Sequence, residues 1–181
     1  MADDEVLAVR ARKVLYDFVR ASPGYHLREI ARATNLSITL VDYHLRFLEK
    51  HELVTSAMDG EYKRFYPRYA VGDAEARPAL SEREKLALGF LRQRVPLMVV
   101  SFLMEREAAH HKEVLGHVPV SASTLTHHLK KLTKAGVVVK DTDQRYRVAD
   151  GREIARLMVT YDLATPHQVD AFVRVWGEFR V

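Results

Sequence analysis

The sequence predicts a mainly α-helical protein with two small β-hairpins, built from two copies of one fold. Three observations support this prediction. An internal repeat relates the two halves of the chain, and apolar residues in each copy recur with the period of a helix. Each copy then ends in two β-prone runs joined by a turn. The length of 181 residues is enough for two small domains.

The repeat has an offset of 84 residues and aligns YHLRFLEKHELV with HHLKKLTKAGVV, at 43–54 and 127–138. It extends without a gap from Val14, opposite Met98, to Tyr62, opposite Tyr146. Chance similarity between amphipathic helices rarely persists over so many consecutive positions. We therefore expect two copies of one fold.

In the first copy, spaced apolar residues predict a helix that ends near the breakers at 22–24. A short helix over 26–33, a turn at 34–36 and a helix over 38–51 follow, the last with Ser37 as its N-cap. The buried stripe of this last helix is predicted to be Val41, Leu45 and Leu48. Its opposite face carries Thr39, Asp42, Tyr43, Arg46 and Lys50.

The runs at 53–57 and 61–66, joined across Asp59-Gly60, predict a hairpin. Lys63 and Arg64 are expected near its tip, where they would reach phosphates or a minor groove. A short helix, a turn, a longer helix and a hairpin form the winged helix-turn-helix arrangement, whose second helix is shaped to enter a major groove.

The second copy repeats this order. Pro96 opens a helix over 97–104, and a short helix covers 112–116. Ser121 or Ser123 caps the next helix, and Gly136 lies just past its end. The wing strands are predicted at 137–140 and 145–148, around a turn at 141–144. The buried stripe is Leu125, Leu129 and Leu132, and the exposed face offers Thr124, Thr126, His127, Lys130, Lys131 and Lys134.

The segment PGYHLREIARATNLSITLVDYHLRFLEKHELVTSAMDGEYKRFYP (23–67) resembles the winged helix-turn-helix of archaeal and bacterial regulators of the ArsR/MarR-like group. HLREIA (26–31), YHLRFLE (43–49), Val54 and DGEYKRFYP (59–67) carry the resemblance, and SASTLTHHLKKLTKAGVV (121–138) is similar. The resemblance implies a tandem winged helix-turn-helix transcriptional regulator of archaeal type. The first copy departs from it at Ile38, Thr39 and Leu40, where the family usually has small polar residues, and at Asp42, which would repel phosphates.

Four segments follow from this interpretation: domain 1 (1–69), a linker and connecting helix (70–95), domain 2 (96–149) and C-terminal helices (150–181). Ser81 and Glu84 form a capping-box pattern that opens the connecting helix, expected to run to about Arg94. A helix over 151–161 follows the second wing. The last helix carries an apolar stripe that either packs on the second domain or forms a homodimer interface: Val169, Phe172, Val173, Trp176 and Phe179.

Composition narrows the classes of function. The net charge of +4 permits a nucleic-acid partner without requiring one. No apolar run approaches the ~20 residues that span a bilayer, and no basic leader precedes the first helix, so we expect a soluble cytoplasmic protein without a membrane partner. The absence of cysteine excludes disulfides and thiolate metal sites.

Neither a metal site nor a cofactor is expected. Of the nine histidines, His26 and His44 recur as His110 and His128, which favours packing and hydrogen-bonding roles for these four. The chain has no glycine-rich phosphate loop, no G-x-S-x-G and no H-E-x-x-H, and we therefore expect no enzyme activity.

The expected function is sequence-specific binding of double-stranded DNA by a transcriptional regulator with two recognition helices and two wings. Two alternatives stay open: a protein-interaction scaffold of transcription or chromosome machinery, and a ligand- or metal-responsive repressor. The expected DNA contacts are Ser37, Thr39, Tyr43, Arg46, Lys50, Lys63 and Arg64 in the first copy, and Ser123, Thr124, Thr126, His127, Lys130, Lys131, Lys134 and Arg145 in the second.

Overall fold

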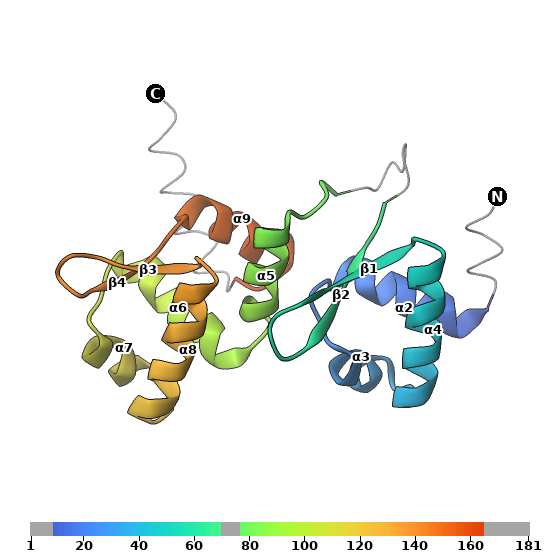
Figure 1. Cartoon of the computed structure of the whole chain (residues 1–181), viewed down its shortest axis with the longest axis horizontal. Helices are drawn as coiled ribbons and strands as arrows, with labels where there is room; N and C mark the ends of the chain where they lie inside the picture. Colours follow the sequence, from blue (N-terminus) through green and yellow to red (C-terminus); the bar gives the residue numbers. More distant parts are fainter. Residues whose placement is uncertain (1–8, 70–76, 165–181) are drawn as a thin grey trace. The chain divides into compact units, whose positions relative to one another are not determined.

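The computed structural model describes residues 9–69 and 77–164 (Figure 1). It is mainly helical and has two small antiparallel sheets, which fits a winged helix-turn-helix fold as the sequence predicts. The chain divides into two compact units, the first ending at Gly89 and the second beginning at Phe90. Each unit is described by itself below.

Unit 1 contains three helices, a hairpin and most of a fourth helix. In chain order these are α2 (Arg10–Ala21), α3 (Leu27–Thr34), α4 (Ile38–Lys50), β1 (Val54–Met58), β2 (Lys63–Pro67) and α5 (Glu82–Leu91). The Ser81 amide donates to Glu84 and the Glu84 amide donates to Ser81, so the predicted capping box opens α5. This helix ends at Leu91, earlier than expected, because the next helix already begins at Arg94.

Local signals set the tight connection between α3 and α4. Asn35 ends α3 in the left-handed conformation, with φ of 55°, which asparagine tolerates better than most residues. Ser37 then caps α4, and its hydroxyl accepts a hydrogen bond from the Leu40 amide at 3.3 Å. The predicted helix, turn and helix are therefore present at the predicted positions.

The core of unit 1 lies between its three helices and the hairpin. The predicted stripe of α4, formed by Val41, Leu45 and Leu48, is completely buried. It packs with Leu15, Val19, Ile30, Leu53, Val54 and Phe65 in one hydrophobic cluster. This packing holds α4 so that the opposite side of the helix faces outward.

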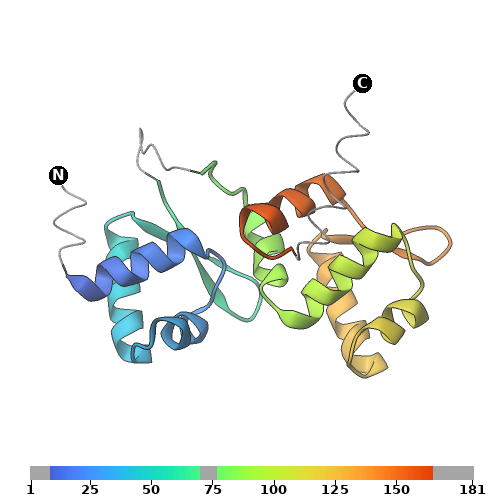
Figure 2. The same cartoon turned by 180° about the vertical axis from the view of Figure 1, so that it is seen from behind.

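Unit 2 repeats the order of elements, as the view from behind also shows (Figure 2). The helix α6 (Arg94–Arg106) extends beyond the expected bounds at both ends. Ser121 rather than Ser123 is the N-cap of α8 (Ala122–Lys134), and Gly136 follows that helix with φ of 70°. The other elements are α7 (His111–His117), β3 (Val138–Lys140), β4 (Tyr146–Val148) and α9 (Gly151–Thr160).

The two hairpins differ in length, which corrects the ungapped repeat. Val54 pairs with Pro67 in the first hairpin, whereas Val138 pairs with Val148 in the second. The offset of 84 therefore holds through the first strand and falls to 81 in the second strand. Matching backbone bonds agree, because the Phe65 amide donates to Tyr25 and the Tyr146 amide donates to Ala109. Tyr146 is thus the equivalent of Phe65, and not of Tyr62.

Among the described residues, no single helix is long and apolar enough to cross a membrane, and α5 with α6 meets that criterion only as a bent pair. The helix predicted over 151–161 is confirmed, since α9 buries Ile154, Leu157 and Met158. The apolar stripe from Val169 to Phe179 lies outside the described residues.

Candidate nucleic-acid interface

The second helix of each helix-turn-helix, α4 or α8, presents four exposed side chains on the face opposite its buried apolar stripe. On α4 these are Thr39, Tyr43, Arg46 and Lys50, which we call the outer stripe of α4. On α8 they are Ser123, His127, Lys130 and Lys134, the outer stripe of α8. The two stripes occupy equivalent positions of the repeat, with spacing i, i+4, i+7 and i+11 along one side of the helix.

Acidic side chains offset the charge around the outer stripe of α4. Asp42 lies one turn before Arg46, and its carboxylate is 2.9 Å from the Arg46 guanidinium. Glu49 accepts hydrogen bonds from Ser56 at 2.6 Å and from the Lys63 ammonium at 2.7 Å. Of the cations expected to contact DNA in this unit, only Lys50 has no ion pair within the described part of the chain.

The outer stripe of α8 carries no such compensation. The chain contains no aspartate or glutamate from Ser121 to Lys140. Lys130 and Lys134 are exposed, and neither forms an ion pair with any described residue. Lys131 is half-buried beside the stripe. The helix therefore presents net positive charge on its outer side, the condition for neutralising phosphates.

Several of the expected polar contacts already serve the fold. The Ser121 hydroxyl accepts from the Thr124 amide at 3.2 Å and lies 2.9 Å from the Thr124 hydroxyl. The Thr126 hydroxyl donates to the Ala122 carbonyl at 2.8 Å and lies 3.0 Å from His111 Nε2. Ser37 is likewise engaged as the cap of α4. These hydroxyls stay exposed, but their first hydrogen bonds stabilise helix ends and turns.

Arg64 lies inside unit 1 rather than at the exposed wing tip where a phosphate contact was expected. Only 1% of the surface of Arg64 is exposed. The guanidinium donates to the Asp59 carboxylate and to the Gly24 carbonyl at 2.8 Å, and it lies 3.6 Å from Glu29. This corrects the sequence-based expectation, because every one of these partners belongs to the unit's own fold. Lys63, by contrast, is exposed as expected.

The Arg64 ion pair ties the first wing to the helices. Burial alone would raise the pKa of Asp59, but hydrogen bonds from the Tyr62 amide and the Arg64 guanidinium lower it below the ordinary 3.8. Tyr62 in turn stacks on His26, with ring centroids 4.8 Å apart, and His26 caps α3. The first wing is therefore fixed against α3 by charge and by stacking.

The second wing holds its equivalent arginine at the surface. The side chain of Arg145 is 43% exposed, and its guanidinium lies 3.1 Å from Asp141 and 3.4 Å from Asp143. Both acids belong to the turn of the same hairpin. The predicted contact residue Arg145 is thus accessible, with two carboxylates beside it.

Histidines take structural positions in both units. The Glu29 carboxylate accepts from the His26 amide, and the Glu113 carboxylate accepts from the His110 amide, so both short helices begin with a reciprocal cap. His44 belongs to the buried side of α4, and burial together with the nearby Arg12 charge lowers its pKa below the ordinary 6.5. Within the described ranges, no group of three or more metal-ligating side chains is assembled.

Sequence reasoning noted the apolar residues at the start of α4 but did not show how exposed they are. Ile38 is 49% exposed, Leu40 is 37% exposed and Tyr43 is 60% exposed. The departures at Ile38 and Leu40 were visible in the sequence, but the periodicity did not show that both side chains remain uncovered. The residues of α8 equivalent to Ile38 and Leu40 are Ala122 and Thr124, which are smaller or polar.

Comparison with known proteins agrees with this geometry in two steps. Residues 9–80 match the model of a family described as an N-terminal HTH domain. This match supports a helix-turn-helix domain in the first unit. The chain is also 27% identical, over 136 residues, to a protein of Methanocaldococcus jannaschii named as an uncharacterized HTH-type transcriptional regulator. That alignment covers 75% of this chain and 32% of the relative, so the chain spans about a third of the relative's length.

Proposed function

We propose that the protein is a transcriptional regulator that binds double-stranded DNA, with α8 making the principal contacts in a major groove. The outer stripe of α8 carries this proposal, because it joins two exposed lysines to a polar N-terminal end in a segment without any acid. Lysines there suit phosphates, while His127 and Ser123 are placed for base edges. The name of the archaeal relative supports the same class of function.

The proposal extends to the first copy of the arrangement, which would make a smaller contribution. The outer stripe of α4 repeats the pattern, but Asp42 offsets Arg46 and Glu49 offsets Lys63. Arg145 and Lys63 are the wing residues that we propose for backbone contacts, and Arg64 is left out because it is buried. The likeness to ArsR/MarR-like regulators remains part of this proposal.

The test removes the two lysines of the α8 stripe. Full-length wild type and the variant Lys130→Ala/Lys134→Ala are titrated against labelled fragments of the source genome at several salt concentrations. Because each phosphate contact releases condensed counterions, the slope of log K against log salt should fall in magnitude by about two in the variant. Affinity should drop on every fragment, since phosphates carry no sequence information.

The matched control removes two exposed cations from α2 with the change Arg10→Ala/Lys13→Ala. It alters net charge by the same amount, so an equal loss in both variants would show only a nonspecific charge effect and would contradict a role for α8. Absence of binding by wild type at low salt to every fragment would overturn the proposed function itself. A circular dichroism spectrum checks that both variants are folded.

One observation favours a second function for the first copy. The first turns of α4 expose Ile38, Leu40 and Tyr43, and exposed large apolar side chains are typical of protein interfaces. We therefore propose, as the alternative for unit 1 only, a protein-interaction role of the scaffold kind. If the change Arg46→Ala/Lys50→Ala leaves DNA affinity unchanged while Lys130→Ala/Lys134→Ala abolishes it, this alternative is preferred.

A further inference from the structure

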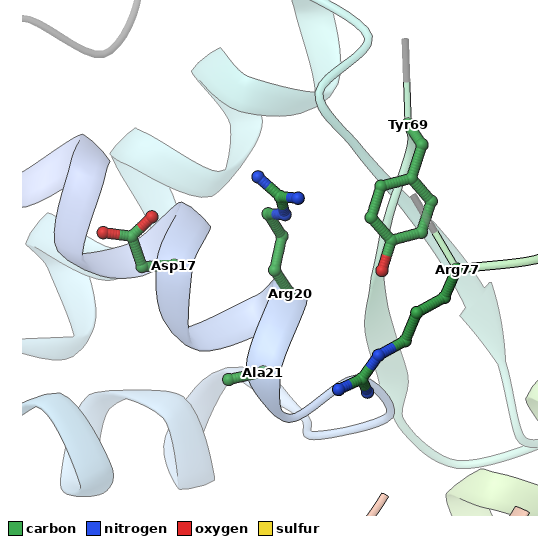
Figure 3. Close-up of a pocket in the computed structure, with 5 residues that line it drawn as sticks. All are labelled: Asp17, Arg20, Ala21, Tyr69 and Arg77. Atoms are coloured by element: carbon green, nitrogen blue, oxygen red, sulfur yellow. The ribbon is translucent and has the colours of Figure 1, made fainter. Parts of the chain in front are cut away.

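Unit 1 contains a pocket that the DNA-binding proposal does not use. It has a volume of about 330 Å³, within the range of small-molecule sites. Figure 3 shows its lining, which comes from the last turns of α2, the residue after the first wing and the segment leading to α5. The residues are Asp17, Arg20, Ala21, Tyr69 and Arg77.

Two arginines set the chemistry of this pocket. The Arg20 guanidinium lies over the rings of Tyr16 and Tyr69, 5.5 Å from each centroid, and two aromatic faces restrict its position. The polar ends of Arg20, Tyr69 and Arg77 gather around one space in Figure 3, whereas Asp17 points away from it. Guanidinium groups recognise carboxylates and phosphates through paired N–H donors.

The groups that face the space narrow the class of ligand. Asp17 lines the pocket but points away from that space, whereas Arg20, Tyr69 and Arg77 face it. Two guanidinium groups and one hydroxyl suit a single oxyanion group. A polyanionic duplex is better matched by the open stripe of α8.

We propose that this pocket binds a small molecule through one carboxylate or phosphate group held by Arg20 and Arg77. Tyr69 provides a hydroxyl on the same side. The site is separate from the DNA contacts proposed above, so its existence does not rest on the proposed function. A regulator with such a site would respond to the concentration of an anionic small molecule.

The test is a nuclear magnetic resonance titration of the full chain without DNA. Inorganic phosphate and acetate are the two probes, and sodium chloride at the same ionic strength is the reference. The side-chain Nε–H signals of Arg20 and Arg77, assigned from the spectra of Arg20→Lys and Arg77→Gln, should shift saturably with at least one probe. The stronger binder distinguishes a phosphate ligand from a carboxylate ligand.

The variant Arg77→Gln should weaken that binding about tenfold, because a charge-assisted hydrogen bond is lost. Arg77 lies outside the helices and strands, and the backbone signals check that its replacement leaves the fold intact. Arg32→Gln removes an exposed arginine of α3 and is the matched control, expected to bind as wild type. Shifts no larger than with chloride, or equal affinity in wild type, Arg77→Gln and Arg20→Lys, would overturn the proposal.

Discussion

The two units share an arrangement of helices and hairpin but distribute their charges in opposite ways. Unit 1 places its expected DNA-contacting cations other than Lys50 in ion pairs, among them Arg46 with Asp42 and Lys63 with Glu49. Unit 2 leaves Lys130 and Lys134 without an ion pair in the described chain. The buried stripes of α4 and α8 are both aliphatic and differ only where Val41 stands opposite Leu125, so the difference in charge lies in the exposed positions. The fold therefore constrains the buried sides of α4 and α8, whereas the residues on their outer sides can differ.

The hairpins repeat this contrast at one pair of arginines. Arg64 pairs across the strand with Ala57, and Arg145 lies across from Asp141, the same place in the repeat. Arg64 is buried because Asp59, Glu29 and Gly24 surround it. Arg145 sits in a shorter hairpin, where its acidic partners are in the exposed turn. One arginine is a structural element of its unit, and its equivalent is a surface group.

The largest effect is expected from breaking the buried pair. Arg64→Ala leaves the Asp59 carboxylate buried without its partner, so unfolding free energy should fall by about 3–5 kcal/mol. Arg145→Ala removes the equivalent but exposed pairs and should change stability far less, because exposed ion pairs contribute little. Urea titration followed by circular dichroism measures both. Equal losses would show that the contrast between the two hairpins has no energetic meaning.

Two glycines offer a second and smaller contrast. A Cβ at Gly89 of α5 would meet Arg64 Cδ at 2.7 Å, and Arg64 cannot move aside without loosening its ion pairs. Gly89→Ala should therefore destabilise the protein by about 1–3 kcal/mol, although alanine is the better helix former. A Cβ at Gly116 of α7 would meet nothing within 4 Å.

The matched change Gly116→Ala should accordingly be neutral or raise stability by up to about 1 kcal/mol through helix propensity. Thermal unfolding of the two single variants gives the comparison directly. If Gly89→Ala is as well tolerated as Gly116→Ala, then α5 does not pack against Arg64 as the structure has it.

The sequence was sufficient for the elements whose signals are local. Ser37 and Gly136 mark helix ends through backbone hydrogen bonding or a left-handed conformation where they were expected, and Ser121 is one of the two caps that the sequence offered. The buried stripes of α4 and α8 follow from periodicity alone, because the apolar side of an amphipathic helix packs against the core.

Long-range partners explain what the sequence did not predict. From the sequence, Arg64 looks like an exposed cation of the wing. The residues next to it in the chain do not show that its guanidinium donates to the distant Gly24 carbonyl. The sequence also did not show the register of the hairpins. The second hairpin is shorter than the first, so the alignment of Tyr62 with Tyr146 is accidental. The pocket of unit 1 has Arg20 and Arg77 in one lining although the whole hairpin separates them in the sequence, which no local pattern encodes.

A milder test of the charge contrast reverses it at one residue. Asp42 occupies the position of Thr126 in the repeat, and its carboxylate offsets Arg46. Asp42→Thr should increase DNA affinity by about threefold to tenfold at low salt, because a repulsive charge is removed from beside the phosphates. The gain should shrink at higher salt as screening grows. A titration at two salt concentrations measures it, and an unchanged or lower affinity would indicate that the outer stripe of α4 does not face DNA.

The smallest effect concerns acid sensitivity in unit 1. The pKa values of His44 and His26 are both lowered, first by burial and then by charges that include Arg12 for His44. The folded state therefore takes up fewer protons than the unfolded chain as pH falls below the ordinary histidine value of 6.5. Stability should be fully present above that value and should decline as pH falls toward the lowered pKa values.

His44→Leu removes one of these groups, so the decline in thermal midpoint between pH 7 and pH 5 should be shallower than in wild type. Asp59 acts only in a separate and more acidic window, because its pKa is lowered from 3.8 and its contribution is lost below that value. A wild-type midpoint that stays constant from pH 7 to pH 5 would contradict the buried neutral state of His44. It would also mean that the buried side of α4 tolerates a charge, and the contrast between a constrained inner side and a divergent outer side would then no longer hold for unit 1.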